Sequence, residues 1–338
     1  MIYRSLSDPI KYGYGVGRVK VLETRLLNVQ RLERLVEAAD FSQAVHILGE
    51  TEYGHVLEGA ETSDEVEKAL DDYSVQVYKF LREANLGENW LSFFLLRHDM
   101  HNLRVILKSH FLGEEVDVFF PPGRLDITSA REAVSLDRFE RLPSPFARAA
   151  RRAKEKYEAT KLGQMIDIVI DQEMFEELYR LALAEKRRFL KEFVMISIDI
   201  ANLKIFLRSK ILGKGLDFVA ESLIEHGTLP KQLFLALFPD SWEGIIGRFR
   251  ATRYANLFVE GWREAMERGS LNHFDAVADN FLLNLAKHGK RVSLGPEPVF
   301  GYTLAKENEI KIIRIILIGK LAGLSKKVLK ERMRSLYV

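Results

Sequence analysis

The chain has 338 residues, of which 47% are hydrophobic and 29% charged, a composition typical of a globular rather than a disordered protein. Its 50 basic and 48 acidic residues nearly cancel, which argues against a dedicated nucleic-acid-binding protein, because such proteins carry a basic face. The absence of cysteine excludes disulfides and thiolate chemistry. No apolar run is long enough to cross a bilayer, so any membrane role is expected to be peripheral.

Helical periodicity dominates the first third of the chain, where apolar residues recur at intervals of three and four. The predicted helices span 19–39, 41–49, 63–81 and 90–112. We expect Asp40 to cap the second helix and Gly113 to end the fourth in the left-handed conformation. The run Gly13-x-Gly15-x-Gly17 lacks the spacing of a phosphate-binding loop, so it is expected to be a flexible lead-in to the first helix.

The remainder of the chain is also predicted to be helical, with loops where proline and glycine gather. The predicted loops are 114–123, 143–145 and 290–302. The predicted helices span 130–139, 146–161, 171–212 with a break near Glu185, 229–238, 240–249, 256–266, 275–287, 305–323 and 326–335. No stretch alternates in the manner of a strand, so we expect an all-α fold.

One predicted helix occurs twice in the sequence with similar residues, and a third copy is less similar. Asp99-Met100-His101-Asn102-Leu103-Arg104 leads to Leu112-Gly113, and Asp199-Ile200-Ala201-Asn202-Leu203-Lys204 leads to Leu212-Gly213. The third copy runs from Glu309 through Arg314 to Gly323 and keeps the acid and the base but not the asparagine. Repeats of this length are typical of scaffolds built from similar parts rather than of a single catalytic cleft.

The repeat extends beyond this helix. Much of 32–57 has a counterpart 201 residues later, and both stretches read as a helix, a capped turn, a second helix and Thr-x-Tyr. The middle copy is degraded, with a remnant at 136–146. We therefore predict three pseudo-symmetric helical repeats, 1–120, 121–220 and 221–338. They are expected to pack into a single body, because each is too one-sided to bury its apolar face alone.

No group of residues in the sequence predicts catalysis, a cofactor or a metal ion. His98, His101 and His110 could ligate a metal from one helix face, but the sister copy holds Ile198, Ala201 and Lys210, so we expect surface or packing histidines. The Gly-Lys pairs are not Walker loops, because the required upstream glycine positions hold Arg208, Asn284 and Arg314. We expect no catalytic, cofactor or metal site and no small-molecule substrate.

Several motifs follow one another in an order that is more specific than any one of them. They are Tyr12-Gly13-Tyr14-Gly15-Val16-Gly17-Arg18-Val19, Glu23-x-Arg25-Leu26-Leu27, Gly49-Glu50-Thr51-Glu52-Tyr53-Gly54, the twin Asn-Leu-Arg/Lys helices, and Lys306-Glu307-x-Glu309-Ile310-x-x-Ile313-Arg314-x-Ile316. Over essentially its whole length the chain resembles the C subunit of archaeal and bacterial A/V-type rotary ATPases, called the d subunit in the eukaryotic enzymes.

The resemblance implies an all-helical, funnel-shaped body with pseudo-threefold symmetry. It would lie on the cytoplasmic face of the membrane ring of proteolipids, peripheral to the cell membrane. Its socket would hold the foot of the central shaft, formed by the D and F subunits. It would carry torque for ion transport and perform no chemistry of its own.

Polar residues of the repeated helix are candidates for an interface or for links between repeats. They are Asp99, Asn102, Arg104, Asp199, Asn202, Lys204, Glu309 and Arg314. They could face the socket and contact the shaft, or they could be structural groups that tie each repeat together, which the shared pattern favours. Acid and base stand five residues apart, so they do not face each other on one helix and each needs a partner on another element.

A basic helix offers a second candidate contact through Arg148, Arg151, Arg152 and Lys154. It could meet an acidic rotor surface or anionic lipid headgroups, and the basic tail at 326–334 shares this ambiguity. The alternative is a solvated surface helix with Glu155 and Glu158 as local partners, which we favour.

Two other classes of protein remain to be compared with a rotor connector. The alternative function is a helical-repeat scaffold that binds a different protein partner, and the two are distinguished by what co-purifies. A helical enzyme is disfavoured because the sequence lacks a catalytic constellation.

Overall fold

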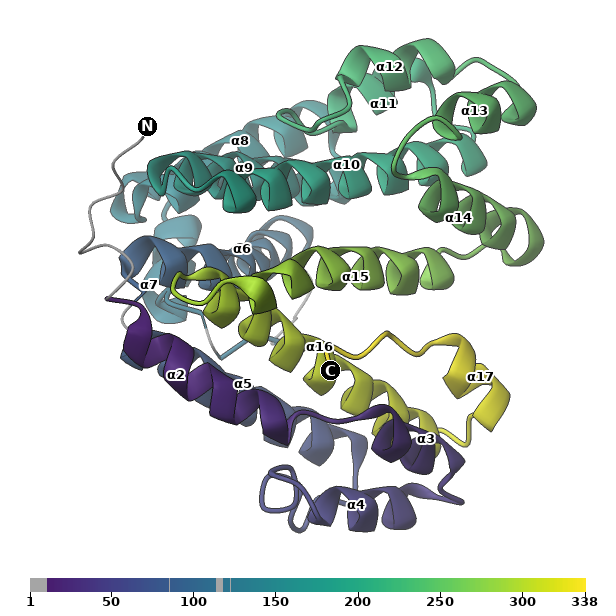
Figure 1. The fold of residues 1–338 in the computed structure, drawn as a ribbon. Coiled ribbons are helices and arrows are strands. Elements are labelled where there is room, and N and C mark those ends of the chain that lie inside the picture. Colours follow the sequence, from purple (N-terminus) through teal and green to yellow (C-terminus); the bar gives the residue numbers. More distant parts are fainter. Residues whose placement is uncertain (1–10, 85, 114–117, 122) are drawn as a thin grey trace, which may run out of the picture. The chain divides into compact units, whose positions relative to one another are not determined.

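The computed structural model describes residues 11–84, 86–113, 118–121 and 123–338. Within these ranges all regular structure is helical and no strand occurs, which confirms the predicted all-α class. The chain divides into two compact units. Figure 1 labels the helices from which they are built. Unit 1 comprises Met1–Leu91 with Asn272–Val338, and unit 2 comprises Ser92–Leu271. The three predicted repeats are a finer division of the sequence and stay a prediction.

Unit 1 joins the two ends of the chain. Its first part contains α2 (Gly13–Leu22), η1 (Glu23–Arg25), α3 (Val29–Glu37), α4 (Phe41–Gly49) and α5 (Ser63–Glu83). Its second part contains α15 (Asn272–Lys287), η3 (His288–Arg291), α16 (Glu297–Leu321) and α17 (Lys326–Glu331). Helix α16 contacts α2, α4, α5, α15 and α17, so a helix from the end of the sequence is the centre around which its beginning packs.

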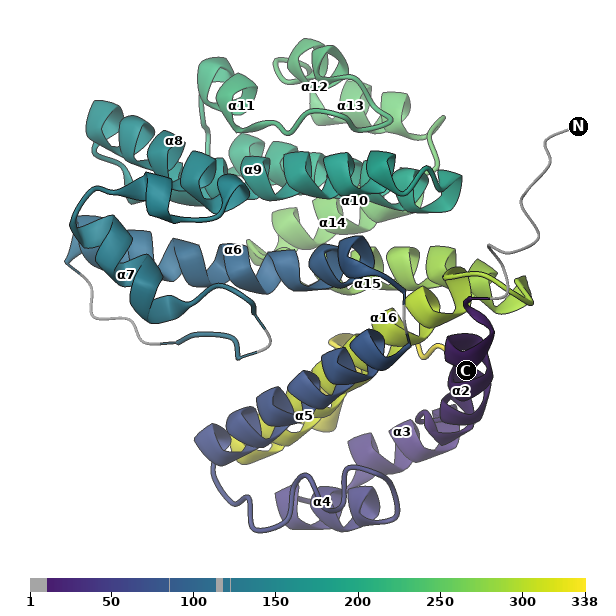
Figure 2. The ribbon, with the colours of Figure 1, turned by 90° about the vertical axis from the view of Figure 1, so that its left-hand side faces the viewer.

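Unit 2 is built from the middle of the chain. Its elements are nearly all of α6 (Glu88–Leu112), α7 (Ile127–Ser135), η2 (Phe139–Arg141), α8 (Ser144–Thr160), α9 (Gly163–Ala184), α10 (Arg188–Ile211), α11 (Leu216–Ser222), α12 (Lys231–Leu237), α13 (Trp242–Phe249) and α14 (Ala255–Arg268). Helices α8, α9 and α10 form a layer in which α9 contacts both neighbours (Figure 2).

The predicted helix ends that rest on capping chemistry are confirmed. The Asp40 carboxylate accepts a hydrogen bond from the backbone N–H of Gln43 at 2.8 Å and begins α4. Gly113, Gly213 and Gly323 all have positive φ, at +68°, +62° and +68°, and each follows one of the long helices. The predicted break near Glu185 is also present, because α9 ends at Ala184 and α10 begins at Arg188.

The prediction for the first helix was wrong in two respects. The glycine run is not a flexible lead-in, because α2 already begins at Gly13. Gly15 lies where a Cβ atom would be only 3.0 Å from the Ala84 carbonyl oxygen, so the run permits a close helix contact. The predicted helix 19–39 is also interrupted, since Leu26 is extended and the Asn28 side chain accepts from the Arg31 N–H to start α3.

Two proline-containing segments predicted as loops are helix starts instead. Pro145 lies in the first turn of α8, and Pro298 lies in the first turn of α16. A proline is tolerated there because the first N–H groups of a helix have no intrahelical partner. Of the predicted loop 114–123, residues 118–121 and Gly123 are non-helical, and the others lie outside the described residues. The short helix α11 was not predicted.

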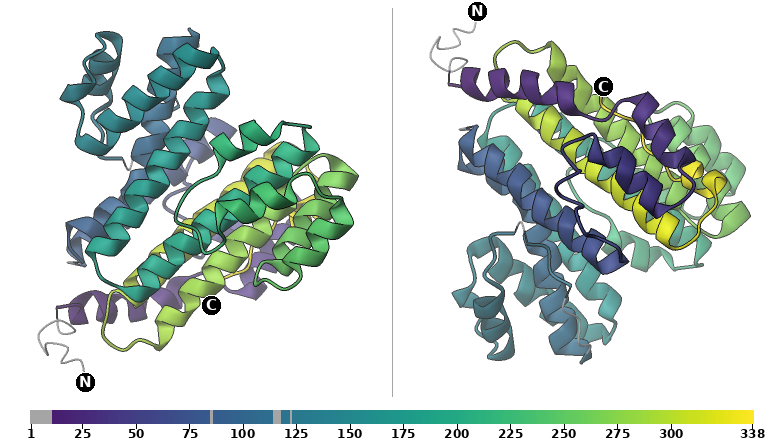
Figure 3. Two further views of the ribbon diagram at one scale, coloured as in Figure 1. Left: turned by 90° about the horizontal axis from the view of Figure 1, so that it is seen from above. Right: turned by 90° about the horizontal axis from the view of Figure 1, so that it is seen from below.

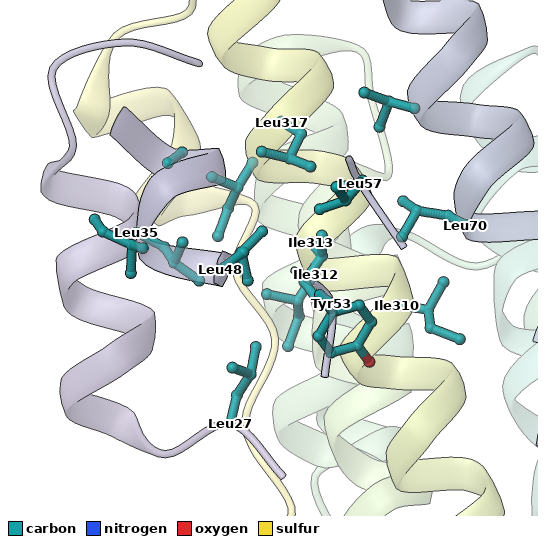
Figure 4. Packing of buried hydrophobic residues seen from close by; sticks show 14 of the residues in the cluster. Leu27, Leu35, Leu48, Tyr53, Leu57, Leu70, Ile310, Ile312, Ile313 and Leu317 are labelled. Carbon is teal, nitrogen blue, oxygen red and sulfur yellow. The ribbon is translucent and has the colours of Figure 1, made fainter. Parts of the chain in front are cut away.

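Each unit has its own apolar core. In unit 1 the side chains of α3, α4 and α5 pack on α16, with Leu35, Leu48, Tyr53 and Ile313 all buried (Figure 4). In unit 2 a second cluster joins α6, α7, α8 and α9, with Met100, Ala149 and Ile170 fully buried. The many small residues of α8 let it approach α9 closely.

Candidate functional site

The repeated acid of the first copy anchors the segment that follows its helix. Asp99 is 3% exposed, and its carboxylate accepts hydrogen bonds from the backbone N–H groups of Arg124 and Leu125, the latter at 2.7 Å. Three residues on, the Asn102 amide exchanges two hydrogen bonds with the backbone of Phe120, at 2.9 and 3.1 Å. Burial raises the pKa of Asp99, and the two backbone donors act in the opposite direction.

The second copy repeats this arrangement. Asp199 is fully buried and accepts from the backbone N–H groups of Thr228 at 3.1 Å and Leu229 at 2.9 Å. Asn202 exchanges two hydrogen bonds with the backbone of Ile224, at 2.8 and 2.9 Å. The Tyr254 hydroxyl donates a further hydrogen bond to Asp199 at 2.6 Å. Asp99 and Asp199 therefore perform the same structural task on α6 and α10.

In the third copy the anchored segment comes from the beginning of the chain. Glu309 is 2% exposed and accepts from the backbone N–H of Leu27 at 2.5 Å and from the Tyr53 hydroxyl at 2.6 Å. Buried Ile312 replaces the asparagine. Figure 3, right, shows the purple N-terminal helices lying across the yellow α16.

Two further contacts show that 27–57 and 228–258 are docked alike. Lys320 donates to the carbonyls of Val36 and Ala38, at 3.2 and 2.6 Å, and so caps the end of α3. Lys210, at the equivalent place eleven residues after its acid, donates to the carbonyls of Phe238 and Asp240, at 2.6 and 2.8 Å. The Thr-x-Tyr turns also match, because Thr51 and Thr252 make the same side-chain hydrogen bonds to their own backbone.

The bases of the repeat pair with acids on neighbouring helices, as the five-residue spacing requires. The Arg104 guanidinium contacts Asp167 at 3.5 Å and also Asp171, both on α9. The Arg314 guanidinium contacts Glu67 and Asp71 on α5, each at 2.6 Å. Burial raises the pKa of Asp171, and the nearby positive charges of Arg104 and Lys204 act in the opposite direction. Two of the three bases thus clamp a pair of carboxylates spaced four residues apart.

The basic helix α8 uses most of its candidate charges inside unit 2. Arg148 and Arg152 both contact the Glu173 carboxylate, which is 2% exposed. Lys154 pairs with Asp137 at 2.5 Å. Arg151 is exposed. A buried carboxylate is retained only with such partners, so these arginines hold α8 against α9.

A buried lysine was not among the predicted site residues. Lys306 is 1% exposed and contacts Glu52 and Glu309, the latter at 2.6 Å. Its ammonium also lies over the rings of Tyr53 and Tyr73, 5.0 and 5.8 Å from their centroids. The spacing Lys306-x-x-Glu309 inside an apolar helix was a signal of this pair.

Two histidines of α6, His98 and His101, are packing residues, and the third, His110, is exposed. The rings of His98 and His101 each make an edge contact with the Phe120 ring, with centroid separations of 5.5 and 4.5 Å. Burial lowers the pKa of His98 to about 3. In the described part of the chain, no three His, Asp or Glu side chains are placed to hold a metal ion. Among the same residues, no helix has both the length and the apolar character needed to cross a bilayer.

The fold and these contacts define an all-helical scaffold protein whose buried polar residues connect its elements. The sequence matches the family model of the ATP synthase (C/AC39) subunit over residues 15–332, and the chain belongs to this family. This confirms the resemblance found in the motifs. The chain is accordingly a structural subunit of a rotary ATPase and not an enzyme.

Relatives are similar over nearly their full lengths. The C subunit of the A-type ATP synthase of Methanocaldococcus jannaschii is 24% identical and aligned over 100% of this chain and 88% of its own length. The C subunit of the V-type sodium ATPase of Enterococcus hirae is 23% identical, over 93% and 95%. The C subunit of the A-type ATP synthase of Methanobrevibacter smithii is 26% identical, over 94% and 86%.

Proposed function

We propose that this chain is the central-stalk connector of an A/V-type rotary ATPase. It joins the shaft, made of the D and F subunits, to the membrane ring of proteolipids, and it lies on the cytoplasmic side, peripheral to the cell membrane. It transmits torque between ATP chemistry and ion transport and performs no chemistry itself. The observation that carries the proposal is the family membership together with the use of buried polar residues as structural anchors.

Torque transmission requires stiffness, and the anchors supply it. A buried carboxylate with two or three donors holds a segment in one place, because releasing it would leave charged and polar groups without partners. Asp99, Asp199 and Glu309 each do this for a segment at least 25 residues away in sequence. Close-packed helices around such anchors resist deformation.

The three-repeat organisation remains part of the proposal. Like partners at positions 99, 199 and 309 support three related copies in the regions 1–120, 121–220 and 221–338. The sequence repeat and the matched lysine caps support it further. Three related parts would suit coaxial attachment to a ring.

Co-purification tests the connector against a general scaffold. Tagged chain is co-expressed with the D and F shaft proteins and the proteolipid ring, and the captured proteins are identified. A connector captures both shaft and ring and is required for the shaft to be retained on ring-containing membranes. Capture of neither, in a folded chain, would favour a scaffold for a different partner.

A further inference from the structure

Two equivalent arginine ion pairs allow the residues of α5 to be aligned with those of α9. Arg314 binds Glu67 and Asp71 of α5, and Arg104 binds Asp167 and Asp171 of α9. Both arginines stand five residues after the anchoring acid of their helix. Position 72 of α5 therefore corresponds to position 172 of α9, and the same shift of 100 applies along both helices.

On α9 the aligned positions lie next to a basic helix, α8. Helix α8 directly precedes α9 in the chain and packs along it. Its Arg152 reaches both Gln172 and Glu173, and Arg148 also binds Glu173. Two apolar positions of the same register, Met165 and Val169, are buried at 2% and 1% exposure.

Within the described residues of unit 1, no helix lies at the corresponding place on α5. The segment that directly precedes α5, residues 50–61, consists of turns. An open cavity of about 390 Å³ lies there. Its walls on the α5 side are Glu65, Lys68, Ala69, Asp72, Tyr73 and Gln76, spaced three and four apart and thus on one face of the helix. The remaining wall is formed by residues 55, 56 and 58–60 of the preceding turns. We call this cavity the α5 groove.

The α5 groove is acidic where its counterpart is apolar. Glu65 and Ala69 stand in place of Met165 and Val169, and both Glu65 and Asp72 are exposed. Three acidic residues line the α5 groove, Glu58, Glu65 and Asp72, against the single basic Lys68. An acidic, concave surface of this kind attracts cationic side chains, both in steering and in contact.

We propose that the α5 groove binds a basic helix of a protein partner, laid against α5 as α8 lies against α9. This proposal rests on the assembly role proposed above. The partner helix contributes arginine or lysine side chains to Asp72 and its neighbours and a small-residue face to Ala69, the combination that α8 itself presents to α9. In unit 2 the basic helix α8 belongs to the same chain as α9, whereas in unit 1 the partner supplies the helix that packs on α5.

The absence of native cysteine allows a direct test in the assembled complex. Gln76→Cys places a single thiol in the groove, and Gln30→Cys places one at an exposed position of α3, outside the groove. Each variant is alkylated with maleimide as free chain and as the complex with shaft and ring. We expect at least ~10-fold slower alkylation at position 76 on assembly and little change at position 30. A thiol-to-amine cross-linker at position 76 should reach a lysine on a helix of the partner.

A charge variant gives a second readout. Asp72→Lys should weaken capture of the partner by ~10-fold at low salt, and Glu61→Lys, with the same charge change outside the lining residues, should not. A complex that forms while the thiol at position 76 reacts at its free rate would overturn the groove proposal and leave the connector role intact. Failure of the unaltered chain to assemble at all would overturn both. A cross-link to a partner segment that is neither basic nor helical would also refute the occupant proposed here.

Discussion

At the scale of residues, the side-chain length of each anchoring acid matches the size of the residue that faces it. A Cβ atom at Gly123 would lie 2.6 Å from Asp99 Oδ1, and one at Gly227 would lie 2.3 Å from Asp199 Oδ1. The short aspartate thus reaches the backbone donors only because a glycine precedes them. In the third copy Leu26 holds this place, and the acid is Glu309, one methylene longer.

We predict that Gly227→Ala destabilises the protein by ~2 kcal/mol or more, because the added methyl group must displace a fully buried carboxylate from its donors. Gly247→Ala is the matched control, since Gly247 is in α13 and, beyond its chain neighbours and the backbone of its own helix, no atom lies within 4 Å of the place that its new methyl group would take. That change should stabilise by up to ~1 kcal/mol through helix propensity. Urea unfolding measures both, and equal effects of the two substitutions would contradict the prediction.

A pH dependence follows from His98. Its pKa is lowered to about 3 by burial, with Arg97 and His101 adding to the effect. Between the ordinary histidine pKa and this value the unfolded chain binds the proton and the folded chain does not. Stability is therefore lost as the pH falls through this window, by up to ~1.4 kcal/mol per pH unit.

Urea unfolding at pH 7 and pH 5 measures this effect. The difference between the two free energies of unfolding should shrink in His98→Gln and persist in His46→Gln, where the histidine is exposed. Comparing the change in unfolding free energy between the two pH values, rather than the free energies themselves, separates titration of His98 from any loss of packing around Phe120. An unchanged pH difference in His98→Gln would show that another group is responsible.

At the scale of elements, local signals located most helices but not all of their ends. The Asp40 cap and the terminal glycines mark boundaries that depend on a few neighbouring residues, and these predictions were confirmed. The predictions that failed concern residues with two uses. Pro145 and Pro298 can end a helix or begin one, and Asn28 interrupts an otherwise continuous apolar pattern by capping a new helix.

The arginine clamps should govern how firmly neighbouring helices are joined. Arg314→Ala removes the partner of Glu67 and Asp71, which are half-exposed, and should cost ~1–2 kcal/mol. Arg34→Ala, which removes a surface ion pair with Glu50, should cost less than ~0.5 kcal/mol. Thermal unfolding compares them; equal losses would mean that the clamp adds nothing beyond a surface ion pair.

At the scale of the whole molecule, the bases of the repeated helices make a prediction about coupling. Replacing Arg104 and Lys204 together with alanine should weaken shaft docking or the stability of the connector. The ATPase activity of the isolated head should be unaffected, because the chain holds no catalytic residue of that reaction. Coupled proton or sodium transport in reconstituted vesicles, measured beside head ATPase activity, tests this. A doubly altered complex that stays stable and fully coupled would remove these residues from the proposed role.

The sequence by itself determined the all-α class, the repeated acid and base, the lack of a catalytic constellation and the family. Periodicity, caps and motif order are local properties, so they can be read without coordinates. Only the tertiary structure decided which segments the acids hold. Glu309 and Leu27 are 282 residues apart, and no spacing rule indicates that the beginning of the chain completes the copy at its end. Such pairings depend on which buried donors meet which acceptors once the helices have packed.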